Sequence, residues 1–138
     1  MKRSLFFFIS FLLLTISLSA WEDGASSFKS LIAKSKRHNV PVIVYVRADW
    51  CPWCVKMDAA LEDSKIDRLF RSKLAVKITP DNSPGEKKIS KMLGVKGFPS
   101  LFVILPNGTK TKLRLTGLGK DNNKLYKTLK KQLDKFYK

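Results

Sequence analysis

The only two cysteines of the chain occur as Cys51-Pro52-Trp53-Cys54, directly after an apolar run at 41–46 that predicts a buried strand. Pro52 suits the first turn of a helix, where its fixed φ is already helical and its missing N–H is no loss. Cys51 is then expected at the N-cap, where its sulfur can accept hydrogen bonds from the backbone N–H groups of Trp53 and Cys54 at the positive end of the helix dipole. Both effects favour a thiolate, the nucleophile of disulfide exchange. The motif therefore predicts a redox-active dithiol.

Other uses of the pair fit less well. A zinc site needs four ligands, and the only other soft ligand is His38. A structural disulfide would close a very short loop, which gives little entropic stabilisation. Two thiolates can bind Cu(I) linearly, so a copper-handling protein stays an alternative, as does a binding module with a vestigial dithiol. We favour redox chemistry with no metal and no organic cofactor.

The start of the chain predicts export. Two basic residues at 2–3 precede an apolar stretch at 5–18, and small residues follow at 17, 19 and 20. The stretch is shorter than the roughly 20 residues of a spanning helix, so residues 1–20 are interpreted as a cleaved signal peptide and residues 21–138 as one domain. An uncleaved membrane anchor is the competing interpretation. Export would place the dithiol in an oxidising compartment, either periplasmic or secreted.

The chain is strongly basic, with a formal net charge of +16, of which +14 is left after residues 1–20 are removed. Its lysines are spread along the sequence and do not cluster with aromatic residues, so we expect no nucleic-acid partner. A solvated lysine-rich surface is the favoured interpretation. Membrane contact is expected only through the signal or anchor, or through weak attraction to anionic head groups.

Apolar periodicity and capping residues predict alternating helices and strands. The expected elements are a helix at 23–37, a strand at 41–46, a helix from 52, a short helix capped by Asp63 or Ser64, a strand at 74–78, a helix at 86–93 ending at Gly94, strands at 100–105 and 110–116, and a helix at 121–136. Parallel strands joined by helices, followed by an antiparallel pair, indicate an α/β protein with a central mixed β-sheet and helices on both faces.

The order of these elements, the dithiol after the first strand and the later segment Gly97-Phe98-Pro99-Ser100 together resemble the thioredoxin fold. The segment at 48–57, ADWCPWCVKM, resembles secreted bacterial thioredoxin-like proteins and is similar to the C-terminal domain of transmembrane thiol:disulfide interchange proteins. The resemblance covers residues 24–137. It implies a thioredoxin fold and thiol-disulfide oxidoreductase activity.

The resemblance also implies roles for individual residues. Cys51, at the exposed end of its helix, would be the attacking cysteine, and the more buried Cys54 the resolving one. Pro99 would follow a cis peptide bond and lie against the dithiol, which places Gly97 and Phe98 beside it.

The remaining residues of the expected docking surface flank the two sulfurs. Trp50, Pro52 and Trp53 lie next to the cysteines in the sequence. They are expected to contact the substrate together with the segment around Pro99. A packing role is an equally good interpretation of Trp50.

Two positions depart from the thioredoxin pattern. Tyr45 stands where thioredoxin has a buried aspartate that accepts the proton of the resolving thiol, and a tyrosine with a pKa near its ordinary value of about 10 is a poor base at neutral pH. Lys77 matches the lysine that pairs with that aspartate. Asp58 and Glu62 follow on the dithiol helix, but their spacing assigns neither to proton transfer.

The direction of exchange does not follow from the Pro52-Trp53 pair, which replaces the Gly-Pro of thioredoxin and tunes the redox potential. We favour a reductase, because the chain lacks the inserted helical domain of the dedicated oxidases. A reductase in an oxidising compartment needs an electron donor, which we expect to be a membrane thiol-transfer protein. Its substrates would be disulfide-bearing exported proteins.

Overall fold

Helices and strands alternate along residues 20–138, the part of the chain that the computed structural model describes; residues 1–19, with most of the expected signal peptide, lie outside it. The elements are β1 (Glu22–Asp23), α1 (Gly24–His38), β2 (Val42–Val46), α2 (Pro52–Leu61), α3 (Ser64–Phe70), β3 (Leu74–Ile78), α4 (Pro84–Leu93), β4 (Ser100–Ile104), β5 (Lys110–Lys112) and α5 (Asn122–Leu133).

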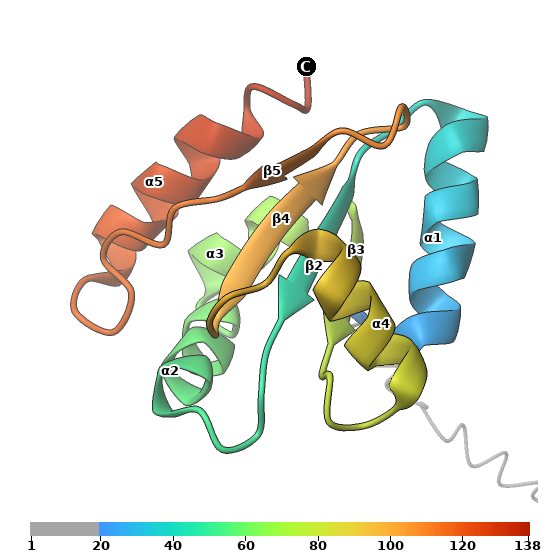
Figure 1. The fold of residues 1–138 in the computed structure, drawn as a ribbon. Helices are drawn as coiled ribbons and strands as arrows, with labels where there is room; N and C mark the ends of the chain where they lie inside the picture. Colours follow the sequence, from blue (N-terminus) through green and yellow to red (C-terminus); the bar gives the residue numbers. More distant parts are fainter. Residues whose placement is uncertain (1–19) are drawn as a thin grey trace, which may run out of the picture.

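The strands form one mixed sheet in the order β1-β3-β2-β4-β5. The pairs β1–β3 and β3–β2 are parallel, and β2–β4 and β4–β5 are antiparallel. The longer strands occupy the middle of the sheet, with β2 between β3 and β4 (Figure 1). This arrangement confirms the predicted central mixed sheet.

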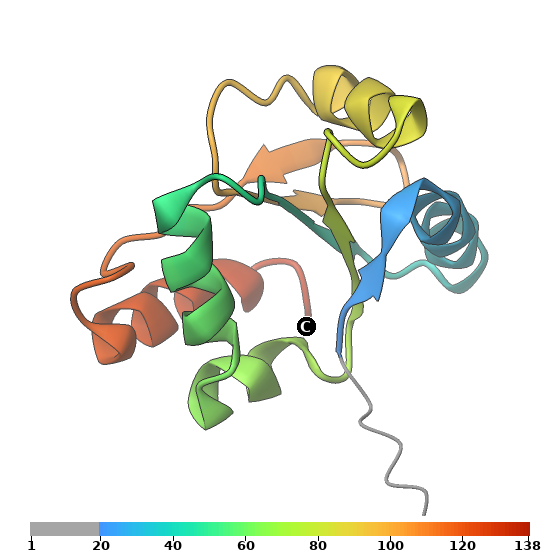
Figure 2. The ribbon, with the colours of Figure 1, turned by 90° about the horizontal axis from the view of Figure 1, so that it is seen from below.

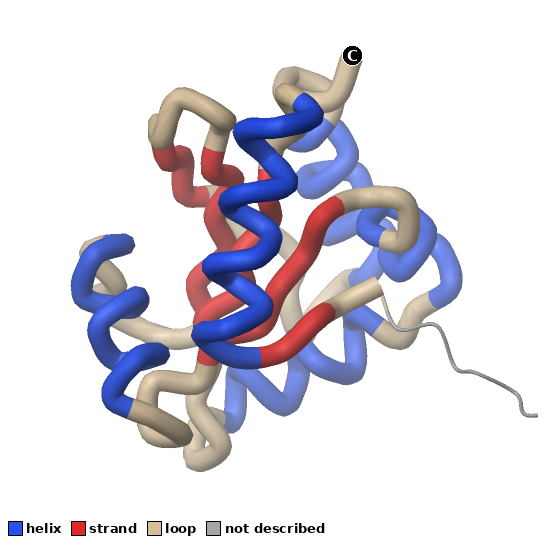
Figure 3. The backbone as a smooth tube through the Cα atoms, turned by 90° about the vertical axis from the view of Figure 1, so that its right-hand side faces the viewer, coloured by secondary structure: helices blue, strands red, loops and turns tan. Residues whose placement is uncertain are grey.

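Two apolar cores lie on opposite faces of the sheet, because side chains alternate along the fully buried β2. Ile43 and Tyr45 pack with α2, α3 and α5, whereas Val42, Val44 and Val46 pack with α1 and α4. The view from below shows the two groups of helices separated by the sheet (Figure 2), and α1 lies across one face of it (Figure 3). The prediction of helices on both faces is confirmed.

Strand β1 was not expected from the sequence. Its two residues, Glu22 and Asp23, have exposed side chains and therefore give no apolar pattern. Backbone pairing with β3 holds them in the sheet. The preceding Trp21 anchors the strand, because its ring packs 5.0 Å from the Phe70 ring and 5.9 Å from the Tyr45 ring, measured between centroids.

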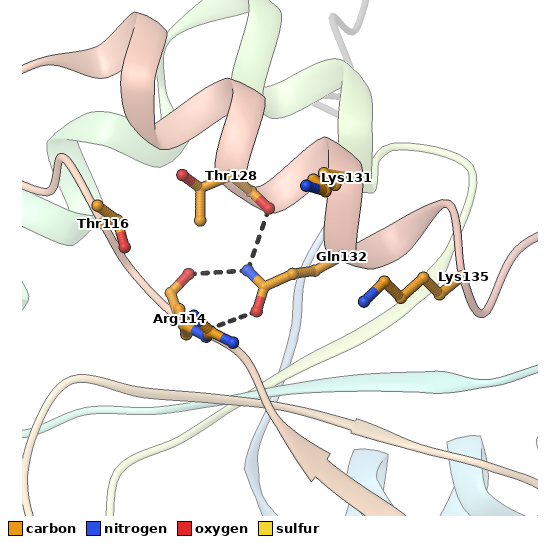
Figure 4. A pocket seen from close by; sticks show the side chains of 6 residues that line it. All are labelled: Arg114, Thr116, Thr128, Lys131, Gln132 and Lys135. Carbon is orange, nitrogen blue, oxygen red and sulfur yellow. Dashed lines mark hydrogen bonds between the residues drawn. The ribbon is translucent and has the colours of Figure 1, made fainter.

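The predicted strand at 110–116 is too long, since β5 ends at Lys112. Beyond it, the backbone of Arg114 bonds a side chain of α5 and not a neighbouring strand. The Gln132 amide accepts from Arg114 N at 2.8 Å and donates to Arg114 O at 3.0 Å. This pair of hydrogen bonds lies in a pocket of about 240 Å³, which is lined by Arg114, Thr116, Thr128, Lys131, Gln132 and Lys135 (Figure 4).

The helix ends follow the capping residues in the sequence. The carboxylate of Asp63 accepts from the backbone N–H groups of Lys65 and Ile66 at the start of α3, and Gly94 ends α4 in the left-handed conformation with φ 70°. Within residues 20–138, no helix is long and apolar enough to cross a membrane.

Candidate active site

The dithiol lies where the central strand β2 leads into α2. Cys51 is the N-cap of α2, with extended backbone angles, and Pro52 begins the helix. The Cys51 sulfur accepts a hydrogen bond from the backbone N–H of Cys54 at 3.1 Å. The predicted N-cap geometry is thus confirmed, whereas the second bond expected from Trp53 N–H is not formed. The two sulfurs are not joined by a disulfide bond.

Both cysteines are buried, although they lie at a helix end. Cys54 is completely buried, as predicted, and Cys51 is only 4% exposed. Cys51 is less accessible than its helix-end position suggested, because Ala48 and Phe98 pack with the two cysteines in a small apolar cluster. Cys51 therefore lies among apolar side chains with little exposure to solvent.

The environment of Cys54 keeps its sulfur protonated. Burial, together with the hydrogen bond to Cys51, raises the pKa of Cys54 to about 12. At neutral pH the reduced form therefore carries a neutral thiol at Cys54, hydrogen-bonded to the Cys51 side chain.

The segment before β4 meets the dithiol at the same end of the sheet. The antiparallel register pairs Val46, the last residue of β2, with Ser100, the first of β4. The Phe98–Pro99 peptide bond is cis, and Ser100 Oγ donates to Gly97 O at 2.7 Å across the turn. Phe98 thereby reaches the cysteine cluster, while Gly97 lies exposed beside it.

Two exposed tryptophan rings, those of Trp50 and Trp53, flank the first cysteine in the sequence. Trp50 is 70% exposed, donates from Nε1 to Asp81 Oδ2 at 3.2 Å, and meets the Phe98 ring edge-on with 5.8 Å between centroids. Trp53 is 46% exposed, and the Lys56 ammonium lies 4.2 Å from its ring centroid. Such exposure is at odds with a core-packing role for Trp50.

Two neighbours of these rings were not singled out from the sequence. Asp81 follows β3 and reaches Trp50 from 31 residues away, and no local pattern indicates such a contact. Gly119 lies against Trp53, because a Cβ atom there would be 3.0 Å from the indole ring. The glycine pair at 117 and 119 was the available signal, since glycines mark turns and close approaches.

A chain of three polar side chains lies behind Cys54. The hydroxyl of the fully buried Tyr45 donates to Asp58 Oδ1 at 3.0 Å, with the Cys54 carbonyl oxygen at 3.3 Å as a second acceptor. Arg47 Nη2 lies 3.1 Å from Asp58 Oδ2, and Arg47 Nη1 lies 2.6 Å from Asp49 Oδ1. We call Tyr45, Asp58 and Arg47 the polar chain.

Protonation within the polar chain is set by burial and charge. Burial, reinforced by the negative charge of Asp58, raises the pKa of Tyr45 far above its ordinary value, so Tyr45 stays a hydrogen-bond donor. Burial acts to lower the pKa of Arg47, but its bond to Asp49 and the charge of Asp58 raise it overall, so the guanidinium stays charged. Lys77 lies beside Tyr45 in the register of β3.

The donor set around the dithiol is small. Among residues 20–138, no group of three or more histidine, cysteine or acidic side chains is placed to hold a metal ion.

The family model of the thioredoxin-like domain matches residues 28–133, a stretch that includes the dithiol, the polar chain and the cis peptide bond. The chain belongs to the thioredoxin-like family. The predicted membership of the thioredoxin-like family is thereby confirmed.

Relatives with known sequences and structures agree with this assignment. The chloroplastic thioredoxin-like protein CITRX of Solanum tuberosum is 33% identical over 95 residues, which cover 69% of this chain and 51% of that protein. This thioredoxin-like chain therefore spans about half the length of that relative.

Solved structures share the fold. A disulphide isomerase from Xylella fastidiosa matches with a TM-score of 0.65 at 22% identity, covering 78% of this chain and 89% of that one. The oxidised C-terminal domain of DsbD from Neisseria meningitidis matches with a TM-score of 0.58 at 22% identity, covering 81% and 94%. These likenesses confirm the thioredoxin fold.

Proposed function

We propose that this thioredoxin-like protein is a thiol-disulfide oxidoreductase that reduces disulfides of exported proteins through Cys51 and Cys54. The observation that carries the proposal is the position of the Cys51 sulfur. It caps α2 and accepts a hydrogen bond from the Cys54 backbone N–H. A helix N-terminus is a favourable place for negative charge, and a cysteine thiolate is the nucleophile of exchange.

The two cysteines would act in sequence. The Cys51 thiolate attacks one sulfur of the substrate disulfide, so that a Cys51–substrate bond forms and the substrate disulfide breaks. The first substrate sulfur leaves as a thiolate and takes a proton. Cys54 then attacks Cys51, which forms the Cys51–Cys54 disulfide and releases the second substrate sulfur. Two electrons pass from the dithiol to the substrate.

The exposed aromatic surface gives this chemistry a docking site. Phe98 packs with the cysteine cluster, the exposed Trp50 ring meets Phe98, and the exposed Trp53 lies between the two cysteines in the sequence, so we expect a substrate strand to lie over these rings. Pro52, Gly97 and Pro99 complete the surface that we assign to substrate binding. Rigid aromatic rings supply contact area at low entropic cost.

We place the protein in the periplasm or outside the cell, with residues 1–20 as its signal peptide. The reducing direction is supported by the compact architecture: α2, α3, β3 and α4 are the only elements between β2 and β4 in the described chain. A reductase there must be re-reduced by an external dithiol, for which a membrane thiol-transfer protein is the expected donor.

Reduction of insulin by dithiothreitol tests the proposed activity. We expect catalytic amounts of the protein without residues 1–20 to speed precipitation of the released insulin chains, because Cys51 exchanges faster than the small thiol. Turbidity against time gives the rate. The same protein with its thiols blocked by iodoacetamide is the control. An unaltered rate with the unblocked protein would refute the proposed activity.

A further inference from the structure

The net charge of the domain is concentrated in residues 87–138. This part of the chain holds 14 lysines and arginines against two acidic residues, Asp121 and Asp134, which leaves a charge of +12. Residues 21–86 hold 11 basic and nine acidic residues, which leaves only +2. The lysines are thus spread along the chain, but the carboxylates that would neutralise them are not. Such an asymmetry indicates an anionic partner.

The fold separates the charges across the sheet. Strand β1 forms one edge of the sheet, and its two exposed side chains, Glu22 and Asp23, are acidic. Strand β5 forms the opposite edge, where Lys110 and Lys112 are exposed. A negatively charged surface would therefore attract the β5 edge and repel the β1 edge, which would orient the molecule.

The positive charge of the β5 edge continues on to α5. Arg114 follows β5, and its backbone is held by the two hydrogen bonds to the Gln132 amide. Three cationic side chains, those of Arg114, Lys131 and Lys135, line the pocket of about 240 Å³ around this amide (Figure 4). We call Lys110, Lys112, Arg114, Lys131 and Lys135 the basic edge.

The cations of the basic edge are available to an external anion. All five are exposed, and none of them forms an ion pair with another side chain of residues 20–138. Lys110 donates one hydrogen bond, to Met92 O at 2.6 Å. An ammonium group has three donors, so Lys110 can still bind an anion.

Met92 gives the basic edge an apolar neighbour. Its side chain is 55% exposed on α4, and it lines a pocket of about 310 Å³ together with Lys110, Phe28 and Ile32. Cations next to exposed apolar surface are typical of proteins that bind at a lipid interface. Single-stranded nucleic acid would instead favour aromatic rings for base stacking, and the exposed aromatic rings of the described residues, Trp50 and Trp53, belong to the dithiol site.

We propose that the basic edge docks the protein on an anionic phospholipid surface. The pocket at Arg114 receives the phosphate of one head group, and Met92 lies against the layer of head groups. Docking does not depend on the exchange chemistry, because no residue of the basic edge belongs to the dithiol site. It would keep the protein beside the membrane electron donor that we propose for it.

Sedimentation with vesicles tests the docking. The protein without residues 1–20 is used, because the apolar stretch at 5–18 would bind lipid by itself. We expect it to sediment with vesicles of equal amounts of phosphatidylglycerol and phosphatidylcholine at about 0.1 M salt, and to stay in solution with pure phosphatidylcholine vesicles. The variant Lys112→Gln/Arg114→Gln/Lys131→Gln should bind the anionic vesicles about 100-fold more weakly, since each cation near such a surface contributes about fivefold in affinity.

Lys34→Gln/Lys65→Gln/Arg68→Gln is the matched control. It removes the same charge from exposed positions on α1 and α3, and it should bind the anionic vesicles nearly as well as the wild type does. Both triple variants should keep the wild-type Tm and rate of insulin reduction, because all the substituted side chains are exposed and none belongs to the dithiol site.

Three results would overturn the docking proposal. They are an equal loss of binding in the control, equal binding of the wild type to neutral vesicles, and failure of the wild type to sediment with anionic vesicles. Tighter binding to a DNA duplex than to the anionic vesicles at the same salt would assign the basic edge to nucleic acid and overturn the proposal as well. Insulin reduction is measured separately, so a failure of docking and a failure of the proposed function are distinguishable.

Discussion

Replacement of Cys51 by serine is expected to abolish exchange, with a fall in insulin reduction of at least about 1,000-fold. A serine hydroxyl is not ionised at neutral pH, so it is a far weaker nucleophile than a cysteine thiolate. Cys54 cannot substitute, because it is fully buried and its pKa is raised to about 12.

Cys54→Ser is the matched variant, and we expect it to block the second step of exchange and not the first. The bond to the Cys51 sulfur comes from the backbone N–H of residue 54, so the substitution preserves it. Cys51 should then attack once and stall as a mixed disulfide with the substrate, visible as the added mass of one substrate chain. Insulin reduction by Cys51→Ser at the wild-type rate would show that the dithiol is vestigial.

Gly117→Ala is expected to cause the largest loss of stability among single glycine substitutions. Gly117 has φ +99°, and a Cβ atom there would lie 2.7 Å from both Asp121 O and Leu125 N, which are backbone atoms at the start of α5. Strain at positive φ and the clash together should lower the free energy of unfolding by at least about 3 kcal/mol. Thermal unfolding followed by circular dichroism should show Tm lowered by roughly 10 °C or more.

Gly108→Ala separates the two causes of destabilisation, which are strain at positive φ and the clash of the added Cβ atom. Gly108 has a similar φ of +87°, but nothing lies within 4 Å of the position of its Cβ. The free energy of unfolding of this variant should therefore fall only by the cost of the left-handed conformation, about 1 kcal/mol. Equal losses in the two variants would show that the packing of residue 117 against α5 contributes nothing.

Local signals in the sequence were enough to predict the position of the dithiol and the main helices and strands. Pro52 and the apolar run before Cys51 predicted an N-cap cysteine, since a helix start depends on neighbouring residues. The continuous apolar run of β2 and the spacing of Leu125, Leu129 and Leu133 are likewise patterns within one element.

Those local signals could not predict contacts between residues that are far apart in the sequence. The spacing of Asp58 on its helix does not reveal that this face meets Tyr45, which lies 13 residues earlier on β2. The same holds for the burial of Cys51, which depends on Phe98 of a different loop. The end of β5 was missed because Gln132, 18 residues after Arg114, bonds the backbone there.

The central claim is that the Cys51–Cys54 pair is a reversible redox dithiol and that the protein acts as a reductase. Measuring the reduction potential of this pair tests that claim most directly. The protein is equilibrated with dithiothreitol or glutathione buffers, and the fraction of reduced pair is measured by thiol alkylation, with tryptophan fluorescence as a second readout. We predict a potential near the value of thioredoxin, about −270 mV. A potential near that of a strong disulfide donor, about −120 mV, would contradict the reducing direction, and failure to form the disulfide in any buffer would contradict the central claim.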